Sequence, residues 1–189
     1  DNIREINRFI LKPTEDCLGQ TSLEDKLTLF ATALLYHICI GGFLGLGIIY
    51  LIDRFLFNIQ HAVELSAHTA LVAIILAPIA EEALFRLPLT YHHNYLVRPI
   101  KVLLKVDLQP YWRRYFPTIV YVFVSLFALL HVSNYQNSSI LFYVFSVFVV
   151  LPQLVGGLTL SFTRIRLGFW WGVLQHALYN LIFVLLAMV

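Results

Sequence analysis

The sequence predicts an all-α fold, a polytopic transmembrane helical bundle of about five spans with amphipathic surface helices. Hydrophobic residues make up 59% of its 189 residues and charged residues 13%, whereas soluble domains have about 45–50% and about 25%. The apolar residues gather in five stretches, most of them near the roughly 20 residues that a helix needs to cross the hydrocarbon layer. Because lipid offers the backbone no hydrogen-bond partners, we expect these stretches to be helical.

The five predicted spans are residues 27–52, 65–87, 117–132, 140–162 and 167–189. No internal repeat and no Gly/Ser-rich linker separates them. We therefore expect residues 27–189 to form a single transmembrane domain, with the functional motifs in a core over residues 64–189.

Residues 1–26 are predicted to be an amphipathic cytoplasmic segment. Ile3, Ile6 and Phe9 alternate with charged residues at helical spacing, and Pro13 is expected to end the helix. Residues 95–115 interleave apolar and basic side chains in a similar way. Such segments bind membrane lipids, and a basic one is attracted to anionic headgroups.

The distribution of Lys and Arg predicts the orientation in the membrane. The basic residues concentrate in alternate loops, whereas the intervening loops contain only Arg54. Because basic loops remain in the cytoplasm, five spans would place the N-terminus there. The basic residues of the predicted cytoplasmic side are Arg4, Arg8, Lys12, Lys26, Arg98, Lys101, Lys105, Arg113, Arg114, Arg164 and Arg166.

Two adjacent glutamates lie near the end of the second predicted span. An ionisable side chain within a span is costly, so each is a candidate functional group. Consecutive helical residues point about 100° apart, whereas Glu82 and Arg86 share a face and can pair, which leaves Glu81 without that partner. A carboxylate in a water-poor site holds a proton more readily than one in water, as a general base near neutral pH must. Pro78 is expected to release a backbone carbonyl nearby.

Two further polar pairs lie on later spans. Phe127 and His131 share a helix face at the end of the third span, and His176 and Asn180 share one within the fifth. A histidine and an asparagine can together donate two hydrogen bonds to a developing oxyanion. We interpret the other histidines, among them His37, as structural.

These three motifs, Glu-Glu-x-x-x-Arg at 81–86, Phe-x-x-x-His at 127–131 and His-x-x-x-Asn at 176–180, resemble those of the CPBP family. That family groups the CAAX prenyl endopeptidases with bacterial proteins of abortive infection and bacteriocin self-immunity. The resemblance implies an intramembrane endopeptidase in which Glu81 and His131 activate water, while His176 and Asn180 bind the oxyanion. It also implies supporting roles for Glu82, Arg86 and Phe127. The bacterial type of the motifs favours the plasma (inner) membrane.

The family has also been described as zinc metalloproteases. In that alternative Glu81, His131 and His176 would be the ligands of zinc or another divalent metal, since carboxylate and imidazole both bind zinc. We expect no cofactor, because asparagine is a poor zinc ligand and Asn180 suits an oxyanion site better.

The predicted span limits leave one difficulty. Antiparallel spans would place Glu81 near the cytoplasmic end of the membrane and His131 near the other. We expect that the second helix continues past Arg86 and that the third begins within residues 110–116, which would bring both groups toward the middle of the membrane.

The expected partner is a peptide or protein substrate, with or without an attached lipid; no nucleic acid is expected. The competing class is a non-catalytic membrane immunity or scaffold protein that binds a peptide or a partner in the same cavity. A transporter fits less well, because the polar residues cluster at one position and no inverted repeat is visible.

Overall fold

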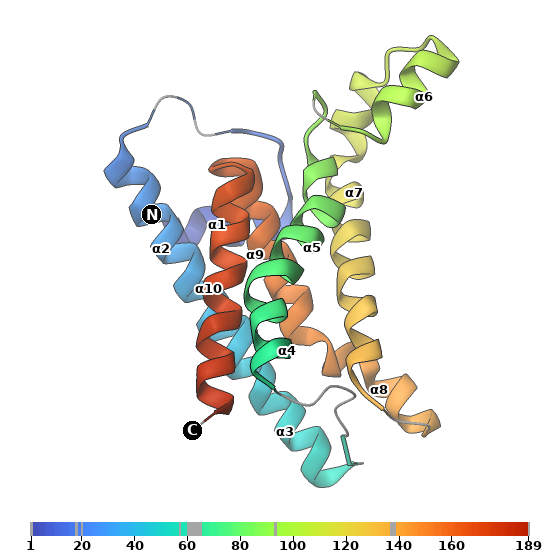
Figure 1. Cartoon of the computed structure of the whole chain (residues 1–189). Helices are drawn as coiled ribbons and strands as arrows, with labels where there is room; N and C mark the ends of the chain where they lie inside the picture. Colours follow the sequence, from blue (N-terminus) through green and yellow to red (C-terminus); the bar gives the residue numbers. More distant parts are fainter. Residues whose placement is uncertain are drawn as a thin grey trace.

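The computed structural model describes residues 2–17, 19, 21–56, 58–59, 66–92, 94–136 and 139–188. Every element in these ranges is helical, and the helices pack as a bundle (Figure 1). The predicted fold class, an all-α polytopic bundle, is confirmed.

Four helices in the described ranges are long and apolar enough to cross a membrane. The first joins α2 (Leu23–Tyr36), η1 (His37–Leu44) and α3 (Gly45–Phe55); the second joins α7 (Gln109–Leu130) and η4 (His131–Asn134); the third joins α8 (Ile140–Val149) and α9 (Leu151–Arg166); the fourth is α10 (Phe169–Ala187). They correspond to four of the five predicted spans.

The remaining predicted span, 65–87, is built from α4 (Ala67–Leu71), η2 (Val72–Leu76) and α5 (Ala77–Phe85), and is not one of those four helices. Residues 65 and 189, two of the predicted limits, lie outside the described residues. The prediction that this helix continues past Arg86 is wrong. A short 3-10 turn, η3 (Leu87–Leu89), follows Arg86, because Pro88 has no N–H with which to extend an α-helix.

The third span begins earlier than its apolar residues indicate. The helix starts at Gln109, just before the region where we expected it, and Pro110 occupies its first turn. Proline is favoured there because the first N–H groups of a helix have no intrahelical acceptor. The helix also passes through Pro117 without ending.

The N-terminal helix α1 (Asn2–Leu11) ends before Pro13, as predicted. Its apolar face is covered by protein: Ile6 is 0% exposed and Phe9 is 1% exposed. The ring of Phe9 meets that of Phe162 on α9 edge-on, with centroids 5.5 Å apart. This face of α1 therefore contributes to the core of the bundle.

Helix α6 (Val97–Leu104) stands away from the bundle at one end, whereas α3 and α8 lie toward the other (Figure 1). Val102 and Leu103 are 71% and 81% exposed. An exposed apolar face beside basic residues suits the membrane surface predicted for residues 95–115.

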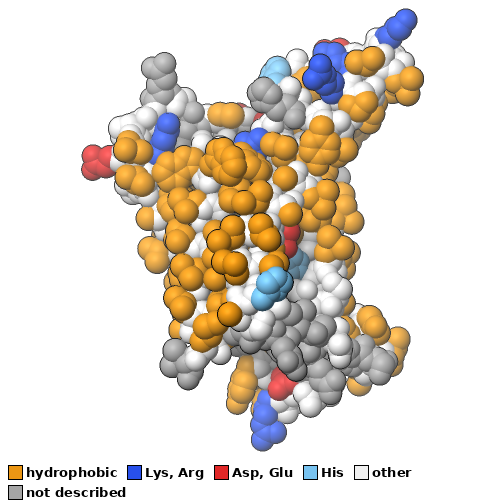
Figure 2. All heavy atoms as spheres, in the orientation of Figure 1, with side chains coloured by type: hydrophobic (Ala, Val, Ile, Leu, Met, Phe, Trp, Pro, Cys, Tyr) orange, Lys and Arg blue, Asp and Glu red, His pale blue; other side chains and the backbone are white. Residues whose placement is uncertain are grey.

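The outside of the bundle is apolar. Leucine, isoleucine, phenylalanine and valine side chains of the spanning helices are widely exposed. Hydrophobic side chains cover a large part of the face seen in Figure 2. Soluble proteins rarely leave so large a continuous apolar surface uncovered. This surface and the apolar helices make the chain an integral membrane protein.

Candidate active site

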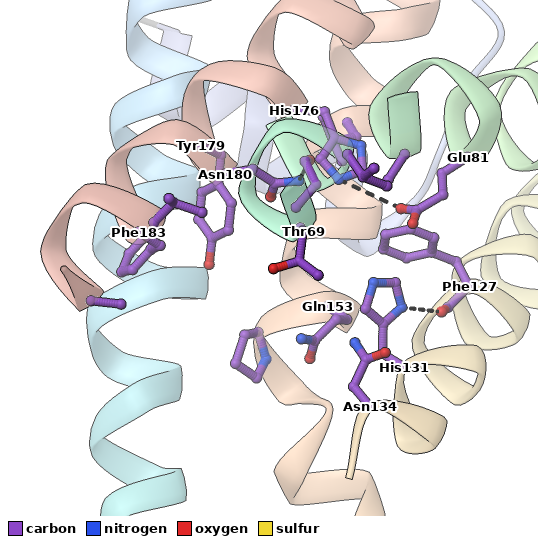
Figure 3. Close-up of a pocket in the computed structure, with 18 of the residues that line it drawn as sticks. Thr69, Glu81, Phe127, His131, Asn134, Gln153, His176, Tyr179, Asn180 and Phe183 are labelled. Atoms are coloured by element: carbon purple, nitrogen blue, oxygen red, sulfur yellow. Dashed lines mark hydrogen bonds and ion pairs between the residues drawn. The ribbon is translucent and has the colours of Figure 1, made fainter. Parts of the chain in front are cut away.

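The four residues predicted to do chemistry line one cavity of about 690 Å³ (Figure 3). Glu81 reaches it from α5, His131 from the end of α7, and His176 and Asn180 from α10. Phe127, Tyr135, Tyr179 and Phe183 contribute aromatic rings to the wall of the cavity. Residues far apart in the sequence thus meet in one place.

The two adjacent glutamates occupy different environments. Glu82 is completely buried, and its Oε1 lies 3.5 Å from Nη1 of Arg86, which is the predicted pair. The side chain of Glu81 is 28% exposed and lines the cavity. Within the described residues its Oε2 is buried without a hydrogen-bond partner.

Arg86, one member of this pair, also contacts an aromatic side chain of the cavity. Its guanidinium carbon lies 3.7 Å from the centroid of the Phe127 ring, and the Phe127 ring meets the His131 ring at 4.6 Å. A cation over an aromatic face is favourable, and more so without water. Phe127 therefore contacts both the buried ion pair and His131.

His176 lies between the two carboxylates. Its Nδ1 is 3.1 Å from Glu82 Oε1, and its Nε2 is 3.6 Å from Glu81 Oε2. Although the carboxylates leave the helix in different directions, the two ring nitrogens of one histidine face both of them.

The amide of Asn180 is fixed by a backbone carbonyl. Its Nδ2 donates a hydrogen bond of 2.7 Å to the oxygen of Ala73. In the π-helical turn η2 the N–H of Ala77 donates to the backbone oxygen of Val72, and the next donor position is Pro78, which has no N–H. Pro78 thus releases a carbonyl, as expected, and Asn180 uses it.

The hydrogen bond of His131 defines its tautomer. Nδ1 lies 2.8 Å from the backbone oxygen of Phe127. Because a carbonyl oxygen can only accept, Nδ1 carries the proton, and a neutral ring then has its lone pair on Nε2. His131 can therefore accept a hydrogen bond within the cavity that it lines.

Antiparallel spans were expected to place Glu81 and His131 near opposite ends of the membrane, and the structure resolves part of this difficulty. Both side chains reach the same cavity, from α5 and from the end of α7 (Figure 3). The early start of α7 is as expected, whereas the second helix ends at Phe85 instead of continuing.

The arrangement does not form a metal site of the usual kind. Within the described ranges, no group of three or more His, Cys, Asp or Glu side chains is arranged to hold a metal ion. Glu81, His131 and His176 share the cavity without forming such a group. As the side chains stand, they do not fit the zinc alternative.

The cavity also contains polar residues that we did not predict to belong to the site. His37, on the first span, is 3% exposed and stacks on Tyr179 with ring centroids 3.8 Å apart. Gln153, on α9, also lines the cavity. The rule that singled out Glu81, that a polar group in a span is a candidate, applies equally to both.

Comparison with known proteins gives the family. No curated protein and no solved structure matches the chain. The family model of the Rce1-like type II CAAX prenyl endopeptidases matches residues 63–182, which contain all three motifs. Because the match covers more than half of its residues, the chain belongs to the Rce1-like family of type II CAAX prenyl endopeptidases.

Proposed function

We propose that the chain is a glutamate-dependent intramembrane endopeptidase that hydrolyses a peptide bond in the 690 Å³ cavity. The family is one of CAAX-type proteases, with peptide or protein substrates. The observation that carries the proposal is that a carboxylate, two histidines and an asparagine from three different helices line one cavity.

The substrate is a peptide that carries a lipid. The cavity combines its polar groups with aromatic side chains, among them Phe127, Tyr179 and Phe183. An apolar chain attached beside the scissile bond would bury its surface there. The family description, a prenyl endopeptidase, supports a prenyl group as that chain.

Glu81 acts as the general base. Its Oε2 lies 3.6 Å from Nε2 of His176 and accepts no hydrogen bond within the described residues. This oxygen takes a proton from water while His131 Nε2 accepts the second O–H and orients the molecule. The water oxygen attacks the carbonyl carbon of the peptide. When the C–N bond breaks, Glu81 returns the proton to the leaving nitrogen, so that the carboxylate is restored.

His176 and Asn180 bind the oxyanion of the tetrahedral intermediate. His176 uses both ring N–H groups in this role: Nδ1–H donates to Glu82, and Nε2–H is the donor to the oxyanion. One N–H of the Asn180 amide is used on Ala73, and the other is the second donor. Hydrogen-bond donors that are in place before the reaction stabilise an oxyanion most strongly in a water-poor site.

This mechanism uses no cofactor. If a divalent metal were required, Glu81, His131 and His176 would have to move together to form a ligand group, since they form none in this structure. The residues present support water activation by a carboxylate and a histidine instead.

The chain lies in a bacterial plasma (inner) membrane with its N-terminus in the cytoplasm. Lys and Arg side chains appear mainly at the end of the molecule that carries α6, and Arg54 belongs to α3 at the opposite end (Figures 1 and 2). The side with more basic residues remains cytoplasmic.

The test is cleavage of a farnesylated peptide ending in Cys-Val-Ile-Met by the detergent-purified protein. Glu81→Gln keeps the size of the side chain and removes the base, so the rate should fall by about 10²–10⁴-fold. Glu24→Gln, an exposed position on α2, is the matched control and should cleave at the wild-type rate. A wild-type protein that binds the peptide but never cleaves it would favour the binding protein over the enzyme.

A further inference from the structure

The cavity contains polar atoms that the proposed reaction does not use. Within the described residues, Nδ1 of His37 and Oε1 of Gln153 are buried and have no hydrogen-bond partner. Both residues line the cavity, and Figure 3 shows Gln153 pointing into it. An unpaired buried polar group costs about 1–3 kcal/mol, so such groups in a binding cavity indicate where a ligand supplies the missing partner.

The two residues are neighbours across a close helix contact. A Cβ atom at Gly156 would lie 2.5 Å from Nε2 of His37, so the imidazole lies directly against the α9 backbone at this glycine. Gln153 precedes Gly156 by one helical turn and shares its face of α9. His37 and Gln153 therefore approach the cavity from adjoining positions on η1 and α9.

The place of His37 is fixed on its other face as well. Its ring stacks almost parallel on Tyr179, with an interplanar angle of 7°. Tyr179 lies between His176 and Asn180 on α10. The His37 ring is thus held against the part of α10 that carries the two residues that we assign to the oxyanion.

We propose that His37 and Gln153 form a subsite that binds the peptide backbone of the substrate. Gln153 Oε1 accepts a backbone N–H, and His37 Nδ1 pairs with a backbone group of the adjacent residue. A peptide drawn into a water-poor cavity must satisfy its N–H and C=O groups, and these two side chains do so. The subsite deepens the proposed function and rests on it. His37 lies outside residues 63–182, the part that the family model matches.

The test measures binding of the fluorescent farnesylated peptide ending in Cys-Val-Ile-Met to Glu81→Gln protein by anisotropy. This background retains bound peptide without cleaving it, so the result does not depend on turnover. His37→Phe keeps a flat ring against Tyr179 and removes both nitrogens, and Gln153→Leu removes the amide. Each should weaken binding by roughly tenfold, the effect of about one hydrogen bond. His92→Phe, at an exposed position, is the control and should bind as the background does.

Three peptides, each N-methylated at one amide after the cysteine, identify the bound group. One of them should bind the background protein roughly tenfold more weakly than the parent peptide, and this penalty should disappear in His37→Phe or Gln153→Leu. Thermal unfolding in detergent checks that both variants fold. Variants that bind the parent peptide normally, or that retain the full N-methyl penalty, would overturn the subsite. Loss of wild-type cleavage with binding and coupling intact would overturn only the proposed reaction.

Discussion

At the scale of single residues, the site depends on one histidine held by two carboxylates. Glu82, buried and paired with Arg86, fixes Nδ1 of His176, while Nε2 faces Glu81. The helix spacing predicted the Glu82–Arg86 pair, because i and i+4 share a face. It did not predict the contact with His176, which depends on how α5 and α10 pack, and no local spacing encodes that packing.

Removing one partner of the buried pair should destabilise the protein. Arg86→Met leaves Glu82 buried with only His176 to compensate its charge, and breaking such a pair costs about 3–5 kcal/mol of unfolding free energy. The measurement is reversible unfolding in detergent, followed by circular dichroism. Arg98→Met, an exposed position on α6, should change stability by less than about 0.5 kcal/mol. Equal effects of the two substitutions would argue against a structural role for the pair.

At the scale of helices, the apolar stretches predicted the spans but not all of their ends. Helix α7 begins at Gln109, within a polar and basic segment, because Pro110 suits a first turn. The predicted continuation of the second span failed because Pro88 follows Arg86 so closely. Pro78 indicated that a backbone carbonyl would be released, but the π-helical turn η2 was not predicted, since no residue type is specific to such a turn.

The release of the Ala73 carbonyl by Pro78 can be tested directly. Pro78→Ala restores an N–H that can bond to the Ala73 carbonyl, and this competes with the Asn180 amide. We expect kcat to fall by about tenfold, since a displaced oxyanion donor costs catalysis, while thermal stability stays equal or rises. Cleavage rates and thermal unfolding of the same preparation measure both. Unchanged kcat would show that Asn180 does not depend on the released carbonyl.

At the scale of the whole molecule, the composition predicted the membrane bundle, and the order of motifs predicted which residues meet. Glu81, His131, His176 and Asn180 do share a cavity. The place of His37 could not be predicted, because it results from the packing of the first span on α9, far along the sequence. Ile6 and Phe9 illustrate the same limit: their spacing predicts an apolar face, but not whether lipid or protein covers it.

The two cysteines provide a test of orientation. Cys17 is an exposed free thiol in the N-terminal segment, and Cys39 lies within the first span. With the N-terminus in the cytoplasm, a membrane-impermeant maleimide should label Cys17 in permeabilised cells and not in intact ones. Cys17→Ser should abolish the labelling. Labelling of Cys17 in intact cells would reverse the proposed orientation.

The proposed mechanism depends on Glu81 and His131 activating water without a metal. The most direct measurement is the rate of cleavage of the farnesylated peptide by wild type, Glu81→Gln and His131→Ala, each with and without a chelator. Both variants should lose at least about 10²-fold in rate, and the chelator should leave the wild-type rate unchanged. Wild-type activity abolished by the chelator and restored by zinc, or full activity of Glu81→Gln, would contradict it.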